Sequence, residues 1–185
     1  MAKSAHGKRV HQLRKALESN DLVRLRRQKG ADRLEGYVVA IGSTWVVLNV
    51  ATAGEPNGWA VVRLADIRDG WKARGKRFLR RAFELANAWP PVAPADQLAI
   101  DGGVRKLIES AAAAFPLVTI FVEDDDPDIC FIGKPVGWTP KKVIWRNLDL
   151  DAAWETHEPR YKLTDITRID IGGRYETLLA HVGDL

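Results

Sequence analysis

The chain contains one cysteine, Cys130, which is the residue type most often used as a nucleophile at neutral pH. A catalytic thiol needs a nearby histidine or another positive charge that lowers its pKa. The four histidines, none of which has a motif spacing to the cysteine, are His6, His11, His157 and His181. We therefore interpret Cys130 as a reduced, structural residue. The sequence also has no glycine-rich phosphate loop, metal-ligand cluster or Ser/His/Asp signature, so we expect a protein that is not an enzyme and holds no cofactor or metal.

A dense acidic run extends from Glu123 to Asp128. Its alternating aspartates are typical of a calcium loop, which also requires a glycine at its sixth position and a glutamate at its twelfth. Those two positions are occupied by Ile129 and Pro135. We therefore interpret the run as a solvated hairpin loop.

Positive residues are concentrated at the N-terminus, with ten Lys and Arg among the first 33 residues. The candidate nucleic-acid-binding set is Arg24, Arg26, Arg27, Lys29 and Arg33. Strand alternation places Arg24 and Arg26 on the face opposite Val23 and Leu25, so several cations should share one surface. Clustering of this kind is needed to neutralise phosphates. The alternative is a solvated basic face, or a contact surface for the acidic loop of another copy.

The charge is divided unevenly along the chain. Residues 1–89 carry 18 Lys and Arg against 8 Asp and Glu, a net charge of +10, whereas residues 90–185 carry 10 against 16, a net charge of −6. The boundary coincides with the proline-rich segment 90–96, which cannot continue a helix. We predict a basic module over residues 1–89, a linker over 90–96 and an acidic module over 97–185. No apolar run is long enough to cross a membrane, and a single cysteine is typical of a cytoplasmic protein.

Hydrophobic periodicity predicts the secondary structure of both modules. A helix is expected before the first strand of each half, and in the second half it covers residues 103–115. A further helix is expected over 76–89, with an apolar stripe formed by Phe78, Ala82, Leu85, Ala86 and Trp89. Strands are expected at 36–41, 45–50 and 59–63, with another after Asp66. In the second half they are expected at 117–122, 129–136, 143–149, 159–163 and 166–171. The spacing of turns is typical of small barrels.

Five short segments recur in the same order in both halves, which predicts an internal duplication. The clearest pair is Arg63–Ile67 against Lys162–Ile166. A second pair matches Gly36 and Val39 with Gly133 and Val136. The fold class that follows is mainly β with α: two tandem five-stranded antiparallel barrels, each preceded and followed by a helix.

A helix followed by a strongly bent five-stranded sheet resembles the Sm-like (SH3-like) small-barrel fold. The glycine that opens the second Sm strand corresponds to Gly36 and Gly133. The base-binding Asp and Asn of the Sm motif are replaced by Gly42 and Val46 in the first half. The resemblance therefore implies the scaffold without the residues that read a base.

Seven tryptophans are present, and in short strands Trp usually packs in the core. Trp138, after Gly137, is the best candidate for an exposed aromatic side chain. From these observations we expect a non-enzymatic binding or scaffolding protein that contacts RNA or DNA through its basic module. The alternative is a module for protein interaction or self-association with no role in nucleic-acid binding.

Overall fold

The computed structural model of the chain describes residues 2–27, 31–68, 75–94 and 98–185. Within these ranges the helices are α1 (Ala2–Ser19), α2 (Lys76–Leu85), α3 (Gly103–Ala114) and α4 (Arg174–Val182), with a 3-10 turn at Leu64–Asp66. The strands of the first half are β1 (Leu22–Leu25), β2 (Leu34–Ile41), β3 (Trp45–Thr52) and β4 (Glu55–Arg63). Those of the second half are β5 (Val118–Phe121), β6 (Cys130–Trp138), β7 (Lys142–Asn147), β8 (Arg160–Lys162) and β9 (Arg168–Ile171).

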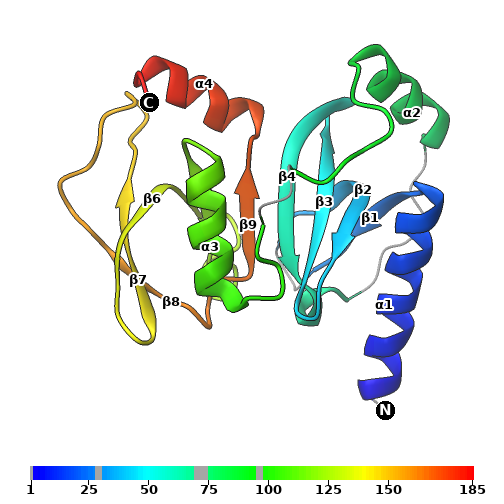
Figure 1. Cartoon of the computed structure of the whole chain (residues 1–185), viewed down its shortest axis with the longest axis horizontal. Coiled ribbons are helices and arrows are strands. Elements are labelled where there is room, and N and C mark those ends of the chain that lie inside the picture. Colours follow the sequence, from blue (N-terminus) through cyan, green and yellow to red (C-terminus); the bar gives the residue numbers. More distant parts are fainter. Residues whose placement is uncertain (1, 28–30, 69–74, 95–97) are drawn as a thin grey trace.

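All nine strands belong to one open antiparallel sheet in the order β1-β2-β3-β4-β9-β5-β6-β7-β8. The prediction of two separate five-stranded barrels is therefore wrong. Strand β9 joins the halves, because it pairs with β4 on one side and with β5 on the other. In Figure 1, β4 and β9 lie side by side at the centre, with α1 at one side of the molecule and α3 in front of the other half.

The reason for the single sheet lies in strand β4, which is buried on both faces. Ala60 and Val62 belong to the core beneath α1, whereas Val61 belongs to the core beneath α3. A strand in a small barrel faces solvent on one side, so it alternates between apolar and polar residues. Strand β4 is covered on both faces, and both of its edges are paired, with β3 and with β9. The core beneath α3 therefore extends from β3 and β4 into the C-terminal half.

The two halves share local geometry. A Cβ atom on Gly36 would overlap the carbonyl oxygen of Asn49, and a Cβ on Gly133 would overlap that of Arg146. Each strand that contains one of these glycines has a register shift a few residues later. The backbone N–H of Arg68 donates to the carbonyl of residue 26 at 2.9 Å, as that of Thr167 donates to the carbonyl of residue 121 at 3.0 Å. Internal duplication and the Sm-like resemblance stay predictions.

Most expected elements are present, with shifted ends. The strand expected at 59–63 is longer, because β4 already begins at Glu55. The strand expected after Asp66 and the end of the linker fall partly on residues 69–74 and 95–97, outside the described residues, and the module boundaries stay a prediction. Of the apolar pairs that mark the repeat, Leu64, Ile67 and Ile166 are buried, whereas Leu163 is only half-buried.

Candidate functional site

The five residues of the candidate nucleic-acid-binding set do not form one surface. Arg24 is paired with Glu35 across β1 and β2. Arg27 is buried and forms an ion pair with Glu123, so its guanidinium faces no solvent. Arg26 and Arg33 are exposed, and Lys29 lies outside the described residues.

Burial of Glu123 also changes the interpretation of the acidic run. Its carboxylate accepts hydrogen bonds from Arg27 and, at 3.0 Å, from the hydroxyl of Thr167. Asp124 is exposed and lies 3.7 Å from the guanidinium of Arg63. The run is therefore a surface loop only from Asp124 onward, and its first residue is part of the interior. In the described part of the chain, no group of three or more His, Cys, Asp or Glu side chains is placed to hold a metal ion.

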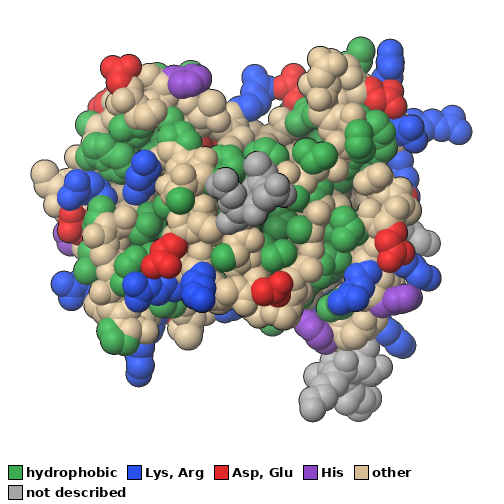
Figure 2. All heavy atoms as spheres, viewed as in Figure 1, with side chains coloured by type: hydrophobic (Ala, Val, Ile, Leu, Met, Phe, Trp, Pro, Cys, Tyr) green, Lys and Arg blue, Asp and Glu red, His purple; other side chains and the backbone are tan. Residues whose placement is uncertain are grey.

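A smaller basic cluster is present where α1, β1 and the end of the 3-10 turn meet. The guanidinium of Arg9 donates to the carbonyl of Arg68 at 3.5 Å, and Arg68 is in turn bonded through its backbone to Arg26. Lys8 and Arg14 are exposed on the outer side of α1. Figure 2 shows Lys and Arg side chains along the margin of the molecule formed by α1 and α2. Positive charge is thus concentrated on the helical margin of the N-terminal half.

Helix α2 begins directly after Gly75, as its sequence predicts, but it buries a different face from the expected one. Leu79 and Phe83 are buried against Leu22 and Tyr37. Phe78 and Leu85, which belong to the expected apolar stripe, are 67% and 70% exposed. The interpretation of these residues as one buried stripe is therefore wrong for Phe78 and Leu85, whereas Trp89, at the end of the stripe, packs against Tyr37.

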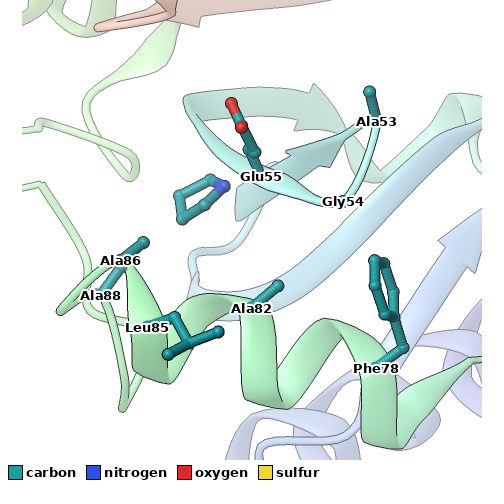
Figure 3. A pocket seen from close by; sticks show the side chains of 9 residues that line it. Ala53, Gly54, Glu55, Phe78, Ala82, Leu85, Ala86 and Ala88 are labelled. Atoms are coloured by element: carbon teal, nitrogen blue, oxygen red, sulfur yellow. The ribbon is translucent and has the colours of Figure 1, made fainter.

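The exposed apolar face of α2 forms one wall of a groove. The opposite wall is the turn between β3 and β4, and Figure 3 shows Phe78, Ala82 and Leu85 lying across from Ala53 and Gly54. The groove has a volume of about 640 Å³ and also includes Glu55, Pro56, Ala86 and Ala88. The groove is open to solvent, and more than half of its lining residues are Ala or Gly.

A second apolar hollow of about 520 Å³ adjoins the groove at Pro56. It lies against α4, where Tyr175 and Leu178 are 49% and 61% exposed. Arg174 and Glu55 form an ion pair between α4 and the β3–β4 turn. The exposed apolar side chains of α2 and α4 therefore flank the same turn, from the two halves of the protein.

No protein-family model matches the chain, and no curated protein and no solved structure matches it significantly. Among the described residues, no helix combines the length and the apolar character needed to span a bilayer.

The remaining candidates for chemistry have structural explanations. Cys130 is exposed, and partial burial of the thiol together with the charges of Asp170 and Glu176 raises its pKa, which disfavours the reactive thiolate. Trp138 is half-buried, and the guanidinium of Arg105 lies 4.9 Å from its ring, so the expectation of a freely exposed aromatic is wrong. In the part of the chain that the structure describes, the exposed aromatic residues are Phe78 and Tyr175.

Sequence reasoning missed the groove, although a signal for it is present. Phe78 and Leu85 are seven residues apart on one helical face, and Leu79 and Phe83 are four apart on a neighbouring one. A helix of ten residues with two apolar faces has more apolar surface than a single contact with a sheet can cover.

Proposed function

We propose that the protein is a non-catalytic binding protein whose main contact surface is the groove between α2 and the β3–β4 turn. The observation that carries the proposal is the exposure of Phe78 and Leu85, about two-thirds of each side chain, along the groove. Large apolar side chains gathered in one groove are typical of protein-binding surfaces. A helical wall of this kind receives an amphipathic segment, which inserts apolar side chains at helical spacing.

The charge around the groove supports an acidic partner. Helix α2 carries Lys76, Arg77, Arg80 and Arg81 against a single Glu84. Glu84 accepts from both Arg80 and Arg81, so α2 as a whole keeps a positive surplus, and Arg77 and Arg81 are its cations nearest to Leu85 around the helix. The partner that fits is therefore a protein segment with apolar residues at helical spacing, flanked by Asp and Glu.

Selection from a displayed peptide library tests this proposal. The selection uses the intact chain as bait, with counter-selection on a Phe78→Ser, Leu85→Ser double variant. Enriched peptides should carry apolar residues at helical spacing with flanking acids, and should bind the double variant at least about tenfold more weakly by calorimetry. The matched control is Leu150→Ser, since Leu150 is 87% exposed and lies outside the groove. Peptides that bind the double variant as well as the original protein, or that are predominantly basic, would overturn the proposal.

Nucleic-acid binding is a second candidate function. It is supported by three arginines that are close in space: the guanidinium of Arg9 donates to the Arg68 carbonyl, and the backbone N–H of Arg68 donates to the carbonyl of Arg26. If this cluster contacts phosphates, affinity for a mixed RNA and DNA pool should fall steeply with salt. Arg26→Glu combined with Arg68→Glu should weaken binding, whereas Arg24→Gln, which removes a cation already paired with Glu35, should have little effect. Arg27 is left intact in this test because its replacement by Glu would place two carboxylates in the interior.

A further inference from the structure

On the side of α2 away from the groove, a cavity of about 250 Å³ lies between the end of α1, the start of β1 and the first turn of α2. Arg80 lines this cavity and is two positions from Phe78, which lines the groove, so the two side chains lie about 200° apart around the helix. The two sites are thus separate surfaces of one helix.

The cavity is rich in positive charge. Lys76, Arg77 and Arg80 line it, and the only carboxylate among its lining residues is Asp21. Lys76 is 2.7 Å from Asp21, whereas Arg77 has no polar partner among the residues that the structure describes. Arg77 and Arg80 remain once Asp21 is paired, and Arg80 is bonded to Glu84, which does not line the cavity.

The start of α2 adds backbone donors to these charges. Helix α2 follows Gly75 with no side-chain cap, and its first turn contains no acidic residue. The N–H of Leu79 makes the first bond of the helix, to Gly75 at 3.0 Å. Among the described residues, the N–H groups of residues 76–78 have no acceptor, and helix N-termini of this kind favour anions.

Tyr37 also lines the cavity and provides an indication of a ligand that is independent of the charges and the helix N-terminus. Its side chain is 1% exposed, and its hydroxyl has no hydrogen-bond partner in the described part of the chain. Buried hydroxyl groups in proteins nearly always have such a partner. Its ring packs edge-on against Phe83 and Trp89, with centroids 5.0 and 5.4 Å away, and this packing fixes the orientation of the ring.

We propose that this cavity binds a phosphate group, with Tyr37 donating its hydroxyl hydrogen to a phosphate oxygen. Arg77 and Lys76 supply the charge, and Arg80 supplies a guanidinium that is stacked 4.8 Å from the Trp89 ring. Arg80 keeps its bond to Glu84 through Nε, at 3.1 Å, so its two terminal nitrogens remain to meet the anion. The site goes beyond the protein-binding groove and does not depend on it.

Calorimetric titration with inorganic phosphate at low ionic strength tests the proposal. We expect saturable binding at one site, weakened about tenfold by Tyr37→Phe, which keeps the aromatic packing and removes only the donor. Arg77→Gln should weaken binding similarly. Arg81→Gln is the matched control, because Arg81 lies on the same helix, contacts Glu84 and does not line the cavity.

Two further titrations distinguish the sources of the phosphate. Tighter binding of a nucleoside monophosphate than of inorganic phosphate identifies a small phosphomonoester as the ligand. Tighter binding of an oligonucleotide that lacks terminal phosphates identifies the backbone of a nucleic acid. Absence of saturable binding by all three probes, or equal affinity of the Tyr37→Phe variant and the original protein, would overturn the proposal.

Discussion

The guanidinium of Arg27 and the carboxylate of Glu123 form an ion pair in the interior, with side chains that are 0% and 1% exposed. Arg27 follows β1 and Glu123 follows β5, so the pair connects the two halves of the chain. Arg27 also donates to the carbonyl of Asp32 at 2.8 Å, and Glu123 accepts from Thr167, next to β9. Because this network of hydrogen bonds joins polar groups from four segments of the chain, it fixes the position of one half relative to the other.

Removal of one member of this pair should be costly. Glu123→Gln leaves a buried guanidinium without its counter-charge, and we expect the free energy of unfolding to fall by about 3–5 kcal/mol. Replacing both partners with apolar residues, Arg27→Met with Glu123→Leu, should be less destabilising than the single change. Urea denaturation measures both, with Arg24→Gln as the surface control at about 0–1 kcal/mol. A double variant less stable than Glu123→Gln would contradict this account.

The stability of the junction between the two halves, where β9 pairs with β4 and β5, should depend on the buried side chains of β9. Ile169 is fully buried and pairs with Val61 of β4 and Ile120 of β5. Ile169→Ala should lower the free energy of unfolding by about 2–5 kcal/mol through the cavity that it leaves. Leu163→Ala should cost less, because Leu163 is only half-buried. If denaturation shows two separate transitions for the variant, the halves do not unfold as one unit.

The two close-packed glycines should tolerate no side chain. Gly36→Ala and Gly133→Ala both force a methyl group into a neighbouring carbonyl oxygen, so each should destabilise the protein by more than about 1 kcal/mol. Gly7→Ala provides the matched control, since nothing lies within 4 Å of the added carbon and α1 is helical there. Thermal melting should show a small gain for Gly7→Ala, because Ala favours a helix.

The two faces of α2 should respond differently to truncation. Phe83→Ala removes a fully buried ring and should cost about 3–5 kcal/mol. Phe78→Ala removes an exposed ring and should change the free energy of unfolding by no more than about 0.5 kcal/mol. A large loss for Phe78→Ala in chemical denaturation would mean that the groove is part of the core and not a binding surface.

The reactivity of Cys130 should rise at higher pH than that of an unstructured cysteine. Because burial and the charges of Asp170 and Glu176 raise the pKa of its thiol, less thiolate is present at any given pH below that value. The rate of alkylation by iodoacetamide should therefore be lower in the folded protein than in urea, and its midpoint should lie at higher pH. Glu176→Gln should move the midpoint downward. Faster alkylation in the folded state would refute this expectation.

Much of the secondary structure could be predicted because each element carries a local signal. The helix over 103–115 and the hairpin around residues 42–44 are confirmed to within a few positions. Burial of β3 and β4 on both faces also has a local signal, since Trp45–Leu48 and Ala60–Val62 are continuous apolar runs typical of such strands. The partner of β4 could not be read from these runs, because it lies at the other end of the chain.

The candidate site was less predictable, for two reasons. Arginine is rarely buried, so Arg27 was assigned to the surface, and its counter-charge Glu123 is 96 positions away. The apolar residues of α2 satisfy helical periodicity on two faces, and only the position of the sheet determines that Leu79 and Phe83 are covered while Phe78 is not. In both places the missing information was a long-range contact.

The central position of β9 also determines when the sheet can be completed during synthesis. Strand β4 leaves the ribosome before β5 to β8 are made, and β9, the strand that pairs with its free edge, follows all of them. Until then the nascent N-terminal half presents an apolar strand with unpaired backbone groups, the type of edge that associates with other chains. A ribosome that stops before β9 would therefore release a product prone to aggregation, whereas a chain that includes β9 pairs this edge of β4 within the same molecule.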